Sequence, residues 1–132
     1  MKKTCTQLAH RRSAGDSRCI VVRRAADGAV RCEQLSWDAK PELSEERKRI
    51  RTKGGVVAQL HDPAGQPVGA YRVFRRPGDL LPGLAMSRSL GDSLAHSLGV
   101  VAKPVFRSYH VQPDDLCVVC LSVVTLLLNQ LS

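Results

Sequence analysis

Aromatic side chains are scarce in this 132-residue sequence. Tryptophan, tyrosine and phenylalanine together make up 4% of the residues, whereas the hydrophobic fraction as a whole is 43%. Any core must therefore be built mainly from valine, leucine and alanine, and the length allows one domain at most. Because few rings lie near the basic residues, stacking on the bases of a single-stranded nucleic acid is not favoured.

Long apolar segments are also missing. Met1-Lys2-Lys3 is followed by polar residues, so we expect no signal peptide. The run 116–128 is too short and too interrupted to cross a membrane, which takes about 20 apolar residues. The five cysteines are an odd number. Together these features predict an intracellular protein, cytoplasmic or nuclear, with reduced thiols and no membrane partner.

Charge is distributed unevenly along the chain. The formal net charge is +8, residues 1–66 hold 14 of the 20 lysines and arginines, and residues 117–132 hold no charged group. A basic balance is typical of proteins that bind nucleic acid or an acidic surface. Here the arginines are scattered, so we expect mostly solvated surface, and nucleic acid is the least favoured partner.

Cys117 and Cys120 form a C-x-x-C pattern. No second pair of ligands lies at a spacing suitable for zinc, and the flanking residues 116–121 are apolar. We therefore expect two thiols on a buried strand rather than a metal or redox site.

A β-hairpin is predicted near the start of the chain. Residues 19–22 favour a strand, Asp27-Gly28 is typical of a type I′ turn, and residues 30–35 form the returning strand. Residues 1–13 are polar and basic without periodicity, and we expect them to form a loose terminus.

A helix is predicted to begin at Ser44, which can serve as its N-cap, and to end at Gly54-Gly55. Acids occupy its first turn and basic residues its far end, which suits the helix dipole. These basic residues therefore need no ligand to explain them.

The rest of the chain predicts more strands and one helical turn. Pro82-Gly83 should lie in an exposed loop, and Pro104 should interrupt the strand that contains it. The strands are expected at 56–60, 70–74, 100–105, 108–111 and 116–121, and the helical turn at 93–98.

Segment 82–92 is the most unusual in the sequence. Ser87, Arg88 and Ser89 interrupt its apolar run, and polar groups pack poorly in a core unless they are hydrogen-bonded. One interpretation is a helix or strand end held by hydrogen bonds to the backbone, with Arg88 paired to a carboxylate. The other is a signature element of an enzyme family.

Four short motifs follow one another along the chain. They are 15–18 (Gly-Asp-Ser-Arg), 37–41 (Trp-Asp-Ala-Lys-Pro), 54–56 (Gly-Gly-Val) and 83–92 (Gly-Leu-Ala-Met-Ser-Arg-Ser-Leu-Gly-Asp). Each alone would be a weak match, but the order and spacing of all four make chance improbable. Together they resemble the metal-dependent protein phosphatases of the protein phosphatase 2C type.

The last motif is the most specific, being similar to the family's Leu-Ala-(Val/Met)-Ser-Arg-(Ala/Ser)-(Leu/Ile/Phe)-Gly-Asp element. Segment 37–41, with Glu45-Glu46-Arg47 and Ile50, is similar to its Asp-His-Lys-Pro segment and the Glu-rich helix that follows, with Ala39 in the place of the histidine. Segment 100–105 resembles its Val-Ile-Ala-Glu-Pro-Glu-Val stretch, with Lys103 in the place of the first acid. The residues that these motifs share with the family are Gly15, Asp16, Ser17, Arg18, Asp38, Ser87, Arg88, Gly91 and Asp92.

We expect these shared residues to be structural neighbours of a site rather than catalytic. Asp16 and Asp92 should cap turns or pair with Arg18 or Arg88.

The resemblance implies an α+β fold, an α-β-β-α sandwich of two antiparallel sheets flanked by helices, of which this chain holds an incomplete part. The expected division is a loose basic terminus (1–13), the central part of the phosphatase domain (14–121) and an apolar tail that departs from the family pattern (122–132). That departure suggests an altered reading frame, a retained intron or an incomplete gene model. Lacking partner strands, the chain should expose sheet edges and be marginally stable or aggregate.

The resemblance also implies a metal-dependent reaction. Family members hydrolyse phosphoserine and phosphothreonine in proteins with two Mg²⁺ or Mn²⁺ ions, which hold the attacking hydroxide between them. The family's Asp-Gly-His-Gly-Gly segment and phosphate-binding arginine have no counterpart before Gly15, and Ser122 stands where the family has Asp-Gly. We therefore expect this chain to have no catalytic residue and to bind neither ion.

Three functions follow, in order of preference. The first is a piece of a protein serine/threonine phosphatase, inactive alone, whose partners are phosphoproteins. The second is a non-catalytic module that binds phosphoproteins or a regulator through the arginine-rich helix 45–53 and the loop 62–82. The third, far behind, is a basic nucleic-acid binder.

Overall fold

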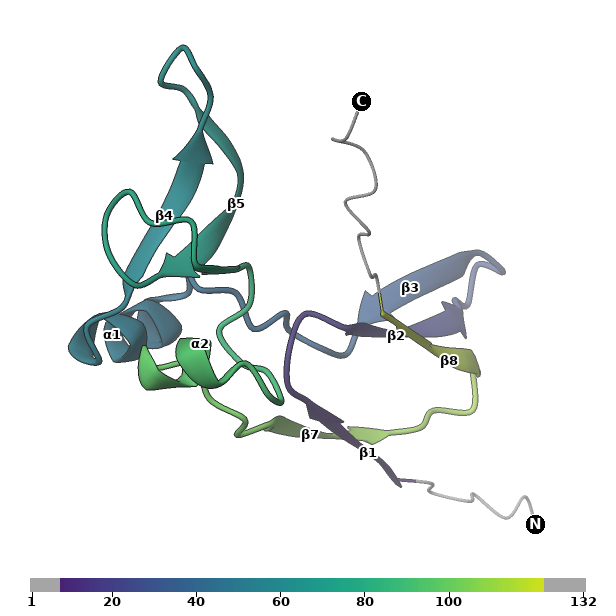
Figure 1. Ribbon diagram of the computed structural model, residues 1–132. Coiled ribbons are helices and arrows are strands. Elements are labelled where there is room, and N and C mark those ends of the chain that lie inside the picture. Colours follow the sequence, from purple (N-terminus) through teal and green to yellow (C-terminus); the bar gives the residue numbers. More distant parts are fainter. Residues whose placement is uncertain (1–7, 123–132) are drawn as a thin grey trace.

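The computed structural model describes residues 8–122 (Figure 1). Within that range the chain forms eight strands and two short helices, in an α+β arrangement of antiparallel sheets as expected. In chain order they are β1 (Leu8–Ser13), β2 (Arg18–Arg24), β3 (Val30–Gln34), α1 (Ser44–Thr52), β4 (Val56–His61), β5 (Pro67–Phe74), β6 (Pro82–Leu84), α2 (Ser93–Ser97), β7 (Val105–His110) and β8 (Asp115–Leu121). Neither helix is long and apolar enough to cross a membrane.

The strands form three small sheets, with orders β1–β7, β3–β2–β8 and β4–β5–β6. The first two face each other on one side of the molecule, and the third extends away on the other side with α1 and α2 at its base (Figure 1). The chain is thus divided into two halves. One is a partly filled sandwich of the sheets β1–β7 and β3–β2–β8, and the other is the sheet β4–β5–β6 with the two helices at its base.

The first hairpin confirms the strands expected at 19–22 and 30–35, but the predicted turn type is wrong. Of its two central residues only Gly28 has a positive φ, 83°, whereas a type I′ turn needs two left-handed residues in a row. Gly28 N–H donates to Ala25 O at 2.9 Å, and Ala29 N–H donates to Asp27 Oδ1 at 3.0 Å. The Asp27 side chain thus holds the turn in a different geometry.

The expectation of a loose terminus over 1–13 is wrong for its second half. Leu8–Ser13 pairs antiparallel with β7, from Leu8 opposite His110 to Ser13 opposite Val105. Its partner lies nearly a hundred residues further on, so no local periodicity could reveal the pairing. Residues 1–7, and 123–132 of the predicted tail, lie outside the described residues.

Two later expectations also need correction. Pro82–Leu84 is the edge strand β6 rather than an exposed loop, because its backbone pairs with β5. Segment 100–105 contributes only a bridge between Val101 and Arg88, and β7 begins at Val105 and continues to His110. Pro104 therefore ends the earlier segment, as its missing N–H predicts.

Helix α1 ends as predicted but begins differently. Lys53 is its C-cap and Gly54 follows with φ 83°, while Leu43 rather than Ser44 is the N-cap, without a side-chain cap bond. Gly55 allows the next strand to turn close to the helix, since a Cβ there would lie 2.7 Å from both Ile50 Cγ2 and Leu98 O.

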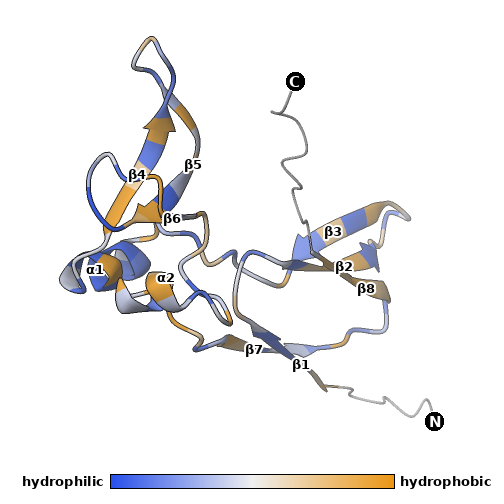
Figure 2. Ribbon diagram, viewed as in Figure 1, coloured by the Kyte–Doolittle hydropathy of each residue, from blue (hydrophilic) through white to orange (hydrophobic). Residues whose placement is uncertain are grey.

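The core lies between α1, α2 and the sheet β4–β5–β6, and it is aliphatic, as the scarcity of aromatics predicts. Figure 2 marks hydrophobic residues on α1, α2 and β4. Tyr71 and Leu84 pack against its rim. The buried members are Ile50, Val57, Val73, Ala95, Leu98 and Val100.

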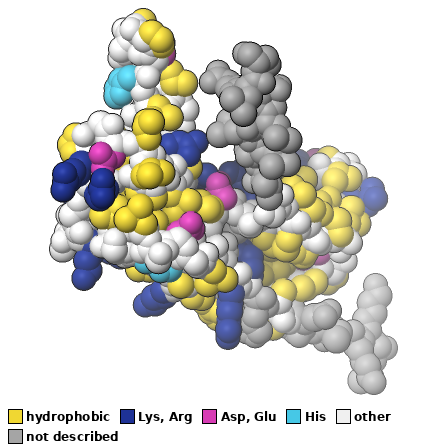
Figure 3. All heavy atoms as spheres, in the orientation of Figure 1, with side chains coloured by type: hydrophobic (Ala, Val, Ile, Leu, Met, Phe, Trp, Pro, Cys, Tyr) yellow, Lys and Arg dark blue, Asp and Glu magenta, His cyan; other side chains and the backbone are white. Residues whose placement is uncertain are grey.

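Strand β8 is much less covered than expected. Cys117 and Cys120 are exposed, so the prediction of two buried thiols is wrong. Among the described strands β8 has one neighbour, β2. Leu116, Val118 and Leu121 are about half exposed, and Figure 3 shows hydrophobic side chains at the surface on both sides of the molecule.

Shortening Ile50 to valine should destabilise the protein by about 1 kcal/mol, because the removed methyl group leaves a void in a fully buried site. The measurement is the urea unfolding midpoint. Leu90→Ala, at a side chain 79% exposed, is the control and should change the free energy of unfolding by less than about 0.5 kcal/mol. Equal effects of the two changes would contradict the placement of the core.

Candidate functional site

Three motif segments that are far apart in the sequence meet between the two halves of the molecule. Ala39 N–H donates to Gly15 O at 2.9 Å, and Ser87 N–H donates to Ala39 O at 2.7 Å. Gly15 has φ 130°, and a Cβ there would lie 3.4 Å from Met86 Sδ. The backbone therefore joins segments 15–18, 37–41 and 86–88 into one cluster.

Two ion pairs link the first two segments of this motif cluster. Arg18 donates to Asp38 through Nη2 at 2.6 Å and Nε at 3.3 Å, and Lys40 Nζ contacts Asp16 Oδ2 at 2.6 Å. The hydrogen bond from Arg18 to Asp38 also raises the pKa of the guanidinium. Asp16 therefore pairs with Lys40, and the expected pairing of Asp16 with Arg18 or Arg88 is wrong. Alternate residues of segment 37–41 supply both partners.

Arg88 does pair with a carboxylate, as the simpler interpretation of segment 82–92 predicted, and that carboxylate is Glu46 on α1. Arg88 Nη2 lies 2.5 Å from Glu46 Oε1, and Nε lies 3.2 Å from Oε2. Arg49 Nη2 lies 2.7 Å from the same Oε2. Glu46 thus receives hydrogen bonds from two guanidinium groups.

The two arginines continue this network into the backbone. Arg49 donates to Gly99 O at 2.7 Å and to Ser87 O at 2.8 Å, and Arg88 Nη1 donates to Lys103 O at 3.0 Å. The Glu46 network therefore ties α1 to segment 86–88 and to segment 99–103.

Burial by itself raises the pKa of Glu46, whose side chain is 8% exposed. Hydrogen bonds from Arg49 and then Arg88 outweigh that effect and lower the pKa to about 2. The carboxylate therefore stays ionised at any physiological pH. An acid that stays charged and is paired with two arginines stabilises the fold, and it is poorly suited to exchange protons.

The remaining motif residues are divided between buried and exposed positions. Ser87 is fully buried, and Ser17 is exposed. Gly91, with φ 84°, and Asp92, with φ 47°, form the left-handed turn before α2. Asp92 is the N-cap residue of α2, but it is exposed and its side chain makes no cap hydrogen bond to the helix.

A separate polar network joins the two facing sheets. Arg23 donates to Asp115 Oδ1 at 2.9 Å and to Tyr109 Oη at 2.5 Å, and Tyr109 Oη donates to Asp115 Oδ2 at 2.7 Å. Although burial raises the pKa of Asp115, hydrogen bonds from the Gln112 backbone, Tyr109 and Arg23 lower it on balance. The sequence motifs do not include these residues, because each comes from a different strand or turn.

The acids of the motif cluster and Glu46 beside it do not fit a magnesium or manganese site. These ions need several oxygen ligands that are free to bind them, whereas Asp16, Asp38 and Glu46 are each paired with lysine or arginine. Within residues 8–122, no group of three or more His, Cys, Asp or Glu side chains is placed to hold a metal. No metal-dependent step is assigned to these residues.

Comparisons with known proteins agree with the motifs. The family description protein phosphatase 2C matches residues 6–122, which is most of the chain. This chain belongs to the protein phosphatase 2C family.

Among relatives, the probable protein phosphatase 2C 12 of Oryza sativa subsp. japonica is 40% identical over 105 residues, covering 80% of this chain and 26% of the relative. The probable protein phosphatase 2C 61 of Arabidopsis thaliana is 37% identical over 101 residues, covering 76% of this chain and 29% of the relative. The chain thus spans between a quarter and a third of these relatives.

Solved structures show the same fold. The serine-threonine phosphatase 2C from Toxoplasma gondii is 27% identical, with a TM-score of 0.65, over 82% of this chain and 35% of that structure. A C. elegans sex determining protein, 20% identical with a TM-score of 0.67 over 87% of this chain and 23% of that one, shares the fold. The α+β architecture expected from the sequence is confirmed as part of a protein phosphatase 2C domain.

The lowered pKa of Glu46 predicts how stability depends on pH. Because the folded-state pKa of about 2 lies below the ordinary value of 4.5, the folded state binds fewer protons than the unfolded state. The stabilisation is present above about pH 4.5 and is lost as the pH falls through about 2; it is about 2 to 3 kcal/mol.

Urea unfolding measured between pH 6 and pH 2 tests this prediction. Glu46→Gln should be less stable at neutral pH, by about 3 kcal/mol, because two guanidinium groups lose their charged partner. The free energy of unfolding of this variant should also fall less steeply as the pH is lowered. Glu45→Gln, at an exposed neighbour, is the control, and its stability should depend on pH as that of the unchanged protein does. Parallel curves for all three proteins would contradict the role of Glu46.

Proposed function

We propose that this chain forms the central scaffold of a protein serine/threonine phosphatase domain that hydrolyses phosphoserine and phosphothreonine in proteins. The observation that supports this role is the pairing of three acids. Asp16, Asp38 and Glu46 each form an ion pair that joins two different chain segments. Residues used in this way hold the domain together and leave metal binding to other parts of it.

The same proposal assigns the cofactor and the partners. The Mg²⁺ or Mn²⁺ ions of the family would be bound by residues other than the described ones, and this chain alone would hold neither. When bound, such ions activate water and stabilise charge on the phosphoryl group. The substrates would be phosphoproteins.

The protein is proposed to act inside the cell, in the cytoplasm or nucleus. Four cysteines in the described range, Cys19, Cys32, Cys117 and Cys120, are free thiols. Free thiols are typical of proteins kept in a reducing compartment.

Family membership favours the phosphatase over the two other functions considered, the non-catalytic binding module and the nucleic-acid binder. Several basic residues that suggested nucleic acid have structural partners instead. Arg18 pairs with Asp38, Arg88 pairs with Glu46, and Arg23 pairs with Asp115.

The purified 132-residue chain should show no turnover of a phosphothreonine peptide above background in Mn²⁺, since Asp16, Asp38 and Glu46 are already paired. The measurement is phosphate release, with the rice relative as positive control. Metal-dependent turnover that is abolished by chelation would contradict the proposal that the chain is a scaffold only.

A chimera tests whether the scaffold is competent. The 105 matched residues of the rice relative are replaced by the corresponding residues of this chain, and Mn²⁺-dependent phosphatase activity is measured. The chimera should be active, because the ligands and the substrate surface come from the relative. Adding Arg88→Met should destabilise it by about 3 kcal/mol, whereas Leu90→Ala should not. A folded chimera that binds Mn²⁺ without turnover would count against the proposal.

A further inference from the structure

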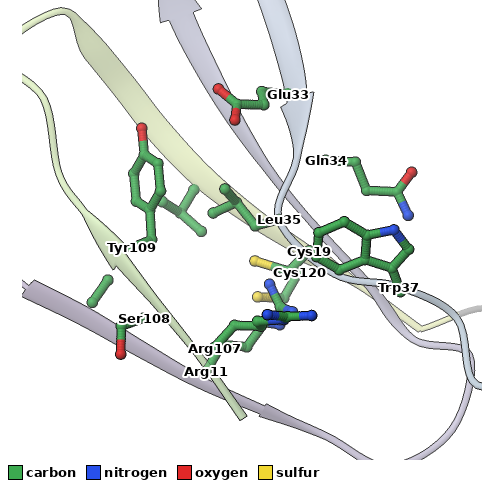
Figure 4. A pocket seen from close by; sticks show the side chains of 12 residues that line it. Arg11, Cys19, Glu33, Gln34, Leu35, Trp37, Arg107, Ser108, Tyr109 and Cys120 are labelled. Atoms are coloured by element: carbon green, nitrogen blue, oxygen red, sulfur yellow. The ribbon is translucent and has the colours of Figure 1, made fainter. Parts of the chain in front are cut away.

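A cavity of about 280 Å³ lies between the sheet β1–β7 and the sheet β3–β2–β8 (Figure 4). Cys19 of β2 and Cys120 of β8 line it, with their sulfur atoms close together in the view. The charged and titratable groups that face them from the other strands are Arg11 of β1, Glu33 of β3, and Arg107 and Tyr109 of β7. A pair of thiols therefore shares a partly open cavity with basic side chains.

The strand register places the two cysteines directly opposite each other. The backbone N–H and carbonyl of Cys19 point away from β8, toward the residues that follow β3. The N–H donates to Ser36 Oγ at 2.7 Å, and the carbonyl accepts from Leu35 N–H at 2.8 Å. Cys19 and Cys120 are thus a non-hydrogen-bonded cross-strand pair, for which the Cα atoms lie about 4.5 Å apart. Disulfides span Cα separations of roughly 4.4–6.8 Å.

The pKa of the Cys19 thiol is raised on balance, and Arg11 is the group that opposes the rise. Burial raises the pKa of Cys19 most, and a hydrogen bond and the charge from Cys120 raise it further, while the positive charge of Arg11 lowers it. Within the described residues, the buried Nε and Nη2 atoms of Arg11 have no hydrogen-bond partner. A guanidinium with two such nitrogens beside two sulfurs would be stabilised by a neighbouring thiolate.

We propose that Cys19 and Cys120 are a redox-active dithiol that closes to an intrachain disulfide when a hydroperoxide oxidises it, with Arg11 stabilising the thiolate. This inference goes beyond the proposed phosphatase function and does not depend on it. It assigns to the cavity a modification site that joins β2 to β8.

The chemistry balances with hydrogen peroxide as the oxidant. The Cys120 thiolate, on the more exposed residue, attacks one peroxide oxygen, the O–O bond breaks, and the products are a sulfenic acid and hydroxide, which takes up a proton to become water. The Cys19 thiolate then attacks the Cys120 sulfur, the S–O bond breaks, and a second water leaves. The thiols lose two electrons and two protons in total.

The same sheet provides a matched negative control. Cys32 of β3 and Cys117 of β8 both lie opposite Val22, on either side of β2. Two strand spacings separate them, about 10 Å, which is beyond the reach of a disulfide. Oxidation should therefore be selective for the Cys19–Cys120 pair.

The test uses the full chain, treated with hydrogen peroxide, quenched with catalase, alkylated and digested without reductant. Mass spectrometry should find the Cys19 peptide joined to the Cys120 peptide, and dithiothreitol should remove this product. The variant with Cys32→Ser and Cys117→Ser should keep the link, whereas Cys120→Ser should leave Cys19 free to alkylate. Free Cys19 and Cys120 thiols after oxidation, intermolecular dimers alone, or equal linkage of Cys32 to Cys117 would overturn the proposal.

The role of Arg11 is tested by the rate of disulfide formation. Arg11→Met should slow it by about threefold or more, because the thiolate fraction falls. Arg12→Met is the control, since Arg12 lies on the other face of β1, 6.0 Å from the centre of the Phe106 ring, and should leave the rate unchanged. Equal rates for both variants would overturn the assistance assigned to Arg11.

Discussion

The buried carboxylate of Glu46, held between Arg49 and Arg88, is the interaction on which the rest of the structure depends. It brings α1 against segment 86–88, and the same arginines continue to the backbone of segment 99–103. The network thus ties α1 to the segments before and after α2, and α1 and α2 both contribute residues to the aliphatic core. Removing one partner from such a pair leaves a charge without compensation in a low-dielectric site, which costs far more than an exposed ion pair contributes.

The motif residues contact one another in this arrangement. Gly15 permits a close approach to Met86, and Asp38 and Lys40 pair with Arg18 and Asp16. Each of these charged residues thus has its partner in the other motif, and the pairs join segments that are far apart in the sequence. In the described structure the acids Asp16 and Asp38 are therefore held by basic partners rather than left free.

The sandwich half of the molecule is organised differently, with a polar network at one edge and two thiols that line its cavity. Arg23, Tyr109 and Asp115 hold the facing sheets together by direct hydrogen bonds. Behind them the interior is only partly filled, and the exposed faces of β8 show apolar side chains that a larger domain would cover. The partly filled interior is also what places Cys19, Cys120 and Arg11 within reach of small molecules.

The sequence alone determined the family, the α+β class, the first hairpin and the end of α1, because motif order, β-branched runs and glycine placement act locally. It also indicated that Arg88 pairs with a carboxylate. Only the tertiary structure decided which one, since Glu46 is 42 residues away from Arg88 and reaches it through the packing of α1. The pairing of β1 with β7, the partner of Asp16 and the exposure of Cys117 and Cys120 were likewise decided there. Each depends on contacts between distant segments, and residue type and local periodicity carry no information about such contacts.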